Sequence, residues 1–312
     1  MMTPNFFIVG APKCGTTALV SYLQDHPNLF LSNPKEPCFF DKDLYRDIKM
    51  TPEAYYSLFE KADEIAHKAV GESSVSYLFS QCAVAEILKF NPEARFIAML
   101  RNPLELVPSW HSQKVFEGRE NILDFAAAWR AEADRRNGKR PSPSGWEIKT
   151  LLYSQWGLLG DQVERLLSQV PRERVMLILF EDFTADTAKV YRQVLSFLGL
   201  PDDGRSHFPR VNEGKQVLSP RLQQSLAFVK LNAEKVKNLL GITRAGGVVN
   251  ALFAWNSRSA SRKPLPEDLH REMSDFYRQD VQKLSSLLGR DLSHWLTPQG
   301  LSQKPEPSGA AR

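Results

Sequence analysis

The sequence has few cysteines and no long apolar run, and each shortage excludes a class of protein. Its three cysteines, Cys14, Cys38 and Cys82, are odd in number, and their spacing matches no zinc-binding pattern. We therefore expect free thiols in a reducing compartment rather than a disulfide framework. No apolar stretch approaches the roughly 20 residues that span a bilayer, so no transmembrane segment is predicted. The N-terminus lacks the basic stretch and cleavage site of a signal peptide, which makes a cytoplasmic protein the expectation.

The charge balance is mildly basic and does not identify a partner. The 312 residues carry a formal net charge of +4, and 24% of them are charged, as in an ordinary soluble globular protein. Such an excess suits an anionic small molecule as well as a nucleic acid. The motifs below, rather than the charge, lead us to expect no nucleic-acid partner.

Short apolar runs alternate with helical patterns along the first two thirds of the chain. Strands buried on both faces of a sheet are predicted at 5–9, 95–100 and 174–180, with a weaker one at 68–73. Helices are predicted at about 15–26, 52–62, 80–90, 103–116, 121–136, 148–169 and 186–198. This alternation indicates an α/β fold, P-loop-like, with a mainly parallel sheet flanked by helices.

The C-terminal third changes character and is predicted to be helical. Two long helices are expected at 219–240 and 265–288, with a loop-like link and no strand between them. The tail 298–312 is too polar and rich in proline to pack, so we expect disorder there. No internal repeat is visible, and a single domain over 1–297 is predicted.

The stretch FFIVGAPKCGTT (6–17) places a glycine-rich turn between a buried strand and a helix. Such a turn presents backbone N–H groups to an anion, and the helix dipole adds to the attraction. A Walker phosphate loop would have Lys and then Ser or Thr directly after Gly15. Here Thr16 and Thr17 take those two places, and Lys13 lies inside the loop. A plain helix cap after a strand is the alternative that the glycines alone leave open.

The string PKCGTT after an apolar strand resembles the 5′-phosphosulfate loop of sulfotransferases that use 3′-phosphoadenylyl sulfate (PAPS). The following HPNLFLSNPKEPCFF is similar to the next segment of the branch that contains the heparan-type carbohydrate enzymes and their bacterial relatives. The resemblance implies that Lys13 lies against the oxygen bridging phosphate and sulfate, where negative charge grows as the bond breaks. It implies PAPS contacts from Lys13, Cys14, Gly15, Thr16 and Thr17. A sulfuryl group carries less charge than a terminal phosphoryl, so this interpretation needs no metal.

A second motif, RFIAMLRNPLELVPSW (95–110), resembles the 3′-phosphate motif of the same family. Arg101 follows a predicted strand, at the edge where open α/β sheets bind ligands. Ser109 lies about two helical turns later. The resemblance implies that Arg101 and Ser109 hold the 3′-phosphate that distinguishes PAPS from ATP.

A third nucleotide contact is implied by NSRSASRKP (256–264), since relatives close a basic, glycine-bearing loop over the nucleotide here. Arg258, Arg262 and Lys263 are the candidates. Serines and an alanine stand where relatives often have Lys-Gly-Arg, which leaves the register of this loop open. A solvated basic loop is the plainer alternative.

Sulfuryl transfer to a hydroxyl or amine needs a base that takes the acceptor's proton. Glu36, in KEPCFF, occupies the position of the catalytic glutamate in carbohydrate sulfotransferases, so the resemblance implies that it is this base. Pro37 would fix the turn, and the next three residues, CFF, would pack it against the core. His111 is the competing base because some sulfotransferases use histidine, although a packed helix histidine is the plainer interpretation.

The stretch GESSVSYLF (71–79) matches a family segment that lines the acceptor cleft. Glu72, Ser74 and Tyr77 are therefore minor acceptor-site candidates. The acceptor implied by the resemblance contains a saccharide, with other small molecules and lipids left open.

Two other functions compete with a PAPS-dependent sulfotransferase. A P-loop kinase or nucleotide triphosphatase would use Glu181 and Asp182, which end an apolar strand as a Walker-B acid would. That interpretation needs magnesium but has no lysine beside Thr17, and acids at a helix start are common. A non-catalytic nucleotide-binding protein is the other alternative, and the presence of both Lys13 and Glu36 argues against it.

Overall fold

The structure, a computed structural model, describes residues 2–44, 50–140, 148–211, 215–217, 257–259 and 264–297. The chain divides into two compact units. The first unit takes its residues from Met1–Leu106, Leu158–Val211 and Pro266–Arg312, and the second from Val107–Gly157 and Asn212–Leu265. The single domain over 1–297 stays a prediction.

The first unit is built on a five-stranded parallel sheet in the order β2-β3-β1-β4-β5. Its strands are β1 (Phe6–Gly10), β2 (Leu29–Leu31), β3 (Ala69–Ser73), β4 (Arg95–Leu100) and β5 (Val175–Leu179). Every residue of β1 is buried, because this central strand is covered on both faces, and its continuous apolar run meets that requirement. The predicted α/β fold with a parallel sheet is confirmed.

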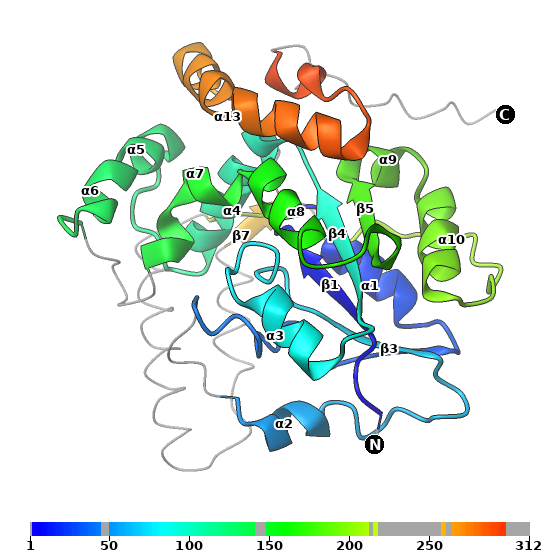
Figure 1. Cartoon of the computed structure of the whole chain (residues 1–312). Coiled ribbons are helices and arrows are strands. Elements are labelled where there is room, and N and C mark those ends of the chain that lie inside the picture. The colour runs from blue at the N-terminus through cyan, green and yellow to red at the C-terminus, as the bar shows by residue number, and fades with distance from the viewer. Residues whose placement is uncertain are drawn as a thin grey trace, which may run out of the picture. The chain divides into compact units, whose positions relative to one another are not determined.

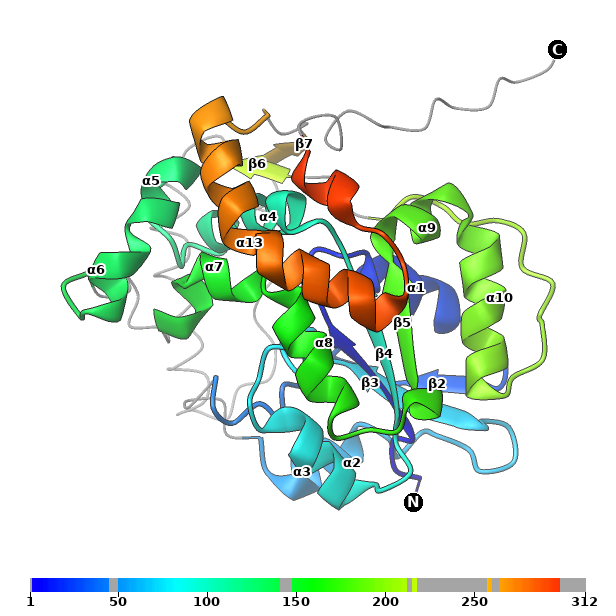
Figure 2. The same cartoon turned by 45° about the horizontal axis from the view of Figure 1, so that its top comes forward.

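Helices cover both faces of this sheet. They are α1 (Thr16–Leu23), α2 (Pro52–Ser57), α3 (Ala83–Phe90), α8 (Leu159–Leu167), α9 (Phe180–Ala185), α10 (Thr187–Leu198) and α13 (Glu267–Leu288), with short 3-10 turns η2 (Arg172–Arg174) and η3 (Ser293–Leu296). Figure 1 shows α3 and α8 on one face and α1 on the other, as right-handed crossovers in opposite directions from the centre of the sheet require. Figure 2 shows α13 beside α8.

The second unit contains most of α4 (Pro103–Phe116) and several short elements. These are α5 (Phe125–Arg130), α6 (Glu132–Arg136), η1 (Ile148–Leu151), α7 (Tyr153–Trp156) and the antiparallel pair β6 (Lys215–Val217) and β7 (Ser257–Ser259). Its interior holds a buried ion pair between Arg135 and Glu120 at 2.6 Å. The Tyr153 hydroxyl also donates to Glu120, at 2.8 Å, and two backbone N–H groups donate to the other carboxylate oxygen at 2.9 Å, so both oxygens of the buried carboxylate are satisfied.

Several predicted elements have different bounds in the structure. The helix expected over 148–169 is three short pieces, η1, α7 and α8, and the helix over 121–136 is divided into α5 and α6. The strand β2 was not predicted, and β7 lies in the link where no strand was expected. The predicted helix 219–240 and tail 298–312 lie outside the described residues. The predicted C-terminal helix is confirmed as α13.

The start of α8 has a tertiary cause. The backbone N–H groups of Gly160 and Asp161 each donate to the Asp280 carboxylate of α13 at 2.8 Å, which caps the first turn of α8. A Cβ on Gly160 would lie 2.3 Å from the Asp280 carbonyl oxygen, so this close approach requires glycine. The helical pattern of 148–169 is therefore interrupted because α8 begins at a cap supplied by Asp280, 120 residues after Gly160 in the chain.

Candidate active site

The carboxyl ends of three neighbouring strands carry most of the residues that the sequence singled out. Lys13 follows β1, Arg101 follows β4, and the segment 74–80 follows β3. The register pairs Ile8 of β1 with Ser73 and Gly10 with Ala98, so the three strands end close together. This edge is where open parallel sheets bind ligands.

The loop between β1 and α1 has the backbone of an anion site. Lys13 has φ 65° and Gly15, the N-cap of α1, has φ 90°, so both adopt left-handed conformations. A Cβ on Gly15 would lie 3.1 Å from the Phe180 ring, which adds a steric reason for glycine. The first amide groups of α1, at Thr16 and Thr17, have no partner within the helix and can donate to an anion.

Cys14 is part of this loop but its thiol lies in the core. The residue is fully buried, and its Sγ lies 3.4 Å from the carbonyl oxygen of Pro12. Burial raises the pKa of the Cys14 thiol to about 12, so it stays protonated near neutral pH. A nucleotide contact from Cys14 would therefore come from its backbone N–H.

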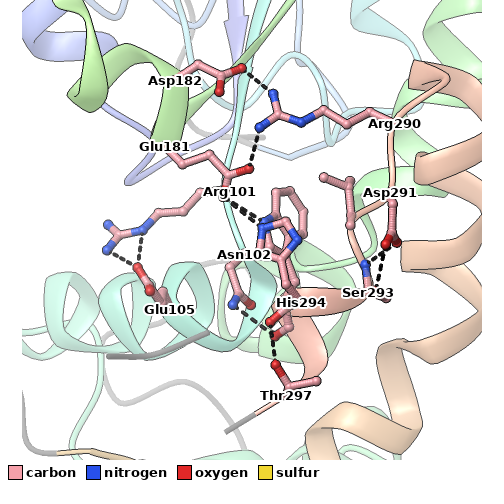
Figure 3. A network of polar contacts seen from close by, with 12 residues as sticks. Arg101, Asn102, Glu105, Glu181, Asp182, Arg290, Asp291, Ser293, His294 and Thr297 are labelled. Atoms are coloured by element: carbon pink, nitrogen blue, oxygen red, sulfur yellow. Dashed lines mark hydrogen bonds and ion pairs between the residues drawn. The ribbon is translucent and has the colours of Figure 1, made fainter. Parts of the chain in front are cut away.

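Arg101 braces the loop from the neighbouring strand. Its Nη1 donates to the Lys13 carbonyl oxygen at 3.2 Å. Its Nε and Nη2 donate to Glu105 at 2.9 and 2.5 Å, as Figure 3 shows. The guanidinium also lies over the Phe180 ring, 4.5 Å from its centroid. Glu105 was not recognised from the sequence, although a carboxylate four residues after an arginine at a helix start was a usable signal. The 3′-phosphate role of Arg101 stays a prediction.

The segment that carries Glu36 has an exposed acid and a packed end. The Glu36 side chain is 44% exposed and accepts a hydrogen bond from Lys35 at 2.9 Å. The Phe39 ring stacks on Tyr55 with centroids 4.3 Å apart, and Phe40 is 3% exposed among aromatic neighbours. The expectation that CFF packs against the core is confirmed.

A buried carboxylate lies behind this segment, at the end of β3. Glu72 is fully buried and accepts hydrogen bonds from the hydroxyls of Tyr55, Ser74 and Tyr77 at 2.9, 2.8 and 2.9 Å. Burial raises the pKa of Glu72 to about 7, and the three hydroxyl donors oppose that rise. Ser74 and Tyr77 are also fully buried, so these residues do not line an acceptor surface as the sequence suggested.

The acids that suggested a magnesium site hold the C-terminal segment instead. The Glu181 carboxylate accepts from Trp295 Nε1 and from Arg290 Nη2, both at 3.1 Å, and lies 3.2 Å from His294 Nε2 (Figure 3). Asp182 forms a second ion pair with Arg290 at 2.5 Å. These contacts give both acids a structural function, which removes the main support for a kinase or triphosphatase.

Two further candidates lie on α4 in the second unit, and both are buried. Ser109 is 2% exposed, and its nucleotide role stays a prediction. His111 is 3% exposed, its Nε2 lies 2.8 Å from the Ile122 carbonyl oxygen, and burial lowers its pKa. Its ring packs against Phe125 and Tyr153 with centroids 5.5 and 5.3 Å away. This environment is that of a packed histidine and argues against His111 as the base.

The third nucleotide contact falls largely outside the described residues. Arg258 lies in β7, where its backbone pairs with Gln216, while Arg262 and Lys263 are not among the described residues. Across the described ranges, no group of three or more His, Cys, Asp or Glu side chains is placed to hold a metal ion. Within the same ranges, no helix combines the length and apolar character needed to cross a membrane.

Curated relatives of known activity align with nearly the whole chain. It is 25% identical over 303 residues to the bifunctional heparan sulfate N-deacetylase/N-sulfotransferase 3 of Homo sapiens, which covers 94% of this chain and 31% of that protein. The chain thus spans about a third of the length of the first such relatives. It is 24% identical over 288 residues to the human heparan sulfate glucosamine 3-O-sulfotransferase 6, covering 92% of this chain and 72% of that protein.

A solved structure and a family match agree with these relatives. The crystal structure of a sulfotransferase from Alicyclobacillus acidocaldarius superimposes with a TM-score of 0.68 at 28% identity, covering 95% of this chain and all of that one. The sulfotransferase domain family matches residues 3–239, which is 237 of the 312 residues and includes the loops after β1, β3 and β4. The chain belongs to the sulfotransferase domain family.

Proposed function

We propose that this chain transfers the sulfuryl group of PAPS to a hydroxyl or amine of a saccharide-containing acceptor. The observation that carries the proposal is the loop after β1, where Lys13 and the first residues of α1 lie at the same sheet edge as Arg101, which contacts the Lys13 backbone. Membership of the sulfotransferase family supports the reaction class. The heparan sulfate named in two relatives supports a saccharide acceptor, and lipid or other small-molecule hydroxyls are the alternatives. The cytoplasmic location expected from the sequence remains part of this proposal.

In this proposal the loop residues bind the donor end of PAPS. The left-handed backbone at Lys13 and Gly15 makes a concave turn whose N–H groups suit phosphate oxygens. Lys13 neutralises the phosphate oxygen that receives the electron pair when its bond to sulfur breaks. This charge develops during the reaction, so stabilisation by Lys13 acts on turnover more than on ground-state binding.

Glu36 accepts the proton in this proposal. The acceptor oxygen or nitrogen attacks sulfur in line with the breaking bond, and its proton moves to the Glu36 carboxylate. The 44% exposure of the Glu36 side chain leaves it accessible to an acceptor, and Lys35 Nζ lies 2.9 Å from one of its carboxylate oxygens.

Nucleotide binding is assigned to residues at the same edge and to the later basic segment. Toward the described residues, Arg101 uses one Nη1 hydrogen on the loop and two donors on Glu105, and we assign its remaining two N–H groups to a 3′-phosphate. The family resemblance supports further nucleotide contacts in this proposal, from Ser109, Arg258, Arg262 and Lys263.

The test is transfer of labelled sulfur from PAPS to a panel of glycan, lipid and small-molecule acceptors. Wild type should label one acceptor class. Lys13→Ala and Glu36→Gln should each lower turnover at least about 100-fold, while calorimetry should show binding of the desulfated nucleotide retained. Lys89→Ala and Glu93→Gln, on side chains 75% and 88% exposed, are matched controls and should keep full activity.

Three outcomes would contradict parts of this proposal. Wild-type turnover in Lys13→Ala would remove its role at the departing phosphate. Full activity in Glu36→Gln would move the base elsewhere. Nucleotide binding with no labelled product, even in a single-turnover experiment, would favour the non-catalytic alternative.

A further inference from the structure

A buried chain of hydrogen bonds joins the end of β3 to the backbone that directly follows Glu36 and Pro37. The N–H of Cys38 donates to Ser74 Oγ at 3.1 Å. The N–H groups of Phe39 and Phe40 both donate to the Tyr77 hydroxyl, at 3.0 and 3.3 Å. Three successive amides of the segment are therefore held by two side-chain hydroxyls.

The Glu72 carboxylate determines the direction of these hydrogen bonds. A hydroxyl has one proton to donate and two lone pairs that accept. Ser74 and Tyr77 each give their proton to Glu72, at 2.8 and 2.9 Å, so their lone pairs are directed to the amides of the Glu36 segment. An ionised carboxylate has no proton to donate and can only accept, so this orientation holds above the raised Glu72 pKa of about 7.

The backbone that these hydroxyls hold is in an uncommon conformation. Cys38 has φ 51°, in the left-handed region that residues other than glycine rarely adopt. Such a conformation persists where the surroundings impose it. Here the hydrogen bond from the Cys38 N–H to Ser74 Oγ stabilises this conformation. Cys38 is only two residues after Glu36 in the chain.

We propose that Ser74 and Tyr77, oriented by Glu72, are positioning residues that fix the direction in which Glu36 meets the acceptor. The inference rests on the proposed function, because it takes Glu36 as the base. None of the three touches the acceptor, since all are fully buried. Their contribution is to hold the segment that carries Glu36, and it is measured in turnover rather than in PAPS binding.

The chain offers a matched pair of variants for the test. Tyr55 and Tyr77 are both fully buried, and both hydroxyls donate to the same Glu72 oxygen at 2.9 Å. Only Tyr77 also accepts from the segment amides. Tyr77→Phe and Tyr55→Phe therefore remove equivalent hydrogen bonds to Glu72, and each keeps its aromatic ring. The difference between the two variants isolates the contact to the segment.

The experiment measures kcat, the KM for PAPS and the urea midpoint of both variants, with wild type and Glu36→Gln alongside. Tyr77→Phe should lower kcat between about tenfold and 100-fold, the effect of a slightly misplaced reacting group, with the KM for PAPS unchanged. Tyr55→Phe should keep the wild-type kcat and lose less urea midpoint, because Tyr77→Phe also leaves the Phe39 and Phe40 amides without their acceptor. Ser74→Ala, which frees the Cys38 amide, should resemble Tyr77→Phe.

The outcomes separate this inference from the proposed function. Equal kcat values for Tyr77→Phe and Tyr55→Phe, with Glu36→Gln inactive, would overturn the positioning role and leave the base assignment intact. A rise in the KM for PAPS as large as the fall in kcat would also overturn it. A wild type without label transfer, or a fully active Glu36→Gln, would instead contradict the proposed function itself.

Discussion

Replacing Glu181 by alanine tests whether this acid anchors the C-terminal segment or serves a metal-dependent reaction. Glu181 accepts from Trp295 Nε1 and from Arg290, both at 3.1 Å, and lies 3.2 Å from His294 (Figure 3). Trp295 is 2% exposed, and its carbonyl oxygen also accepts from the Asn102 side chain at 2.9 Å. The variant would therefore leave a buried indole N–H without its acceptor.

The expected loss of stability follows from these contacts. An unsatisfied buried donor costs about 1–3 kcal/mol. The ion pair with Arg290, whose side chain is 44% exposed, adds at most about 1 kcal/mol because solvent screens it. We expect Glu181→Ala to lower the free energy of unfolding by about 2 kcal/mol, mainly through Trp295.

Urea unfolding of wild type, Glu181→Ala and the control Asp182→Ala measures this effect. In Figure 3 the Asp182 side chain, 47% exposed, forms only the ion pair with Arg290, so its loss should cost less than about 1 kcal/mol. Equal unfolding free energies for the two variants would refute the anchoring role. So would a Glu181→Ala protein that is as stable as wild type but has lost a magnesium-dependent activity.

Two further predictions concern the nucleotide. Arg101→Ala should weaken binding of nucleotides with and without a 3′-phosphate, because Arg101 also braces Lys13 at 3.2 Å. In calorimetry the loss should be larger for the 3′-phosphorylated nucleotide by about 1.5–3 kcal/mol, the value of a charge-assisted hydrogen bond; equal losses would leave Arg101 with the bracing contact alone. Excess EDTA should leave label transfer from PAPS unchanged, because Lys13 and backbone N–H groups, rather than magnesium, neutralise the departing phosphate. An activity that EDTA abolishes and magnesium restores would contradict this assignment.

Local patterns in the sequence were sufficient for the central part of the fold. The runs that form β1, β4 and β5 are continuous and apolar. Such a run is the sequence pattern of a strand that is covered on both faces of a sheet. The turn after β1 was equally readable, because only glycine adopts φ 90° easily where Gly15 begins α1. These features depend on neighbours within a few residues, so the sequence by itself determined the central strands of the sheet and the position of the loop after β1.

Other features depend on partners that are far apart in the chain. Asp280 caps the first turn of α8, so a new helix begins inside the helical pattern of 148–169. Trp295, which is 114 residues after Glu181, donates a hydrogen bond to it and so gives this acid a structural function. Glu72 was recognised only as part of a motif, and its partner Tyr55 was not recognised at all. Burial and the direction of a hydroxyl's proton are properties of the packed interior, which no local pattern encodes. The tertiary structure alone therefore decided which acids are structural and what holds the segment of Glu36.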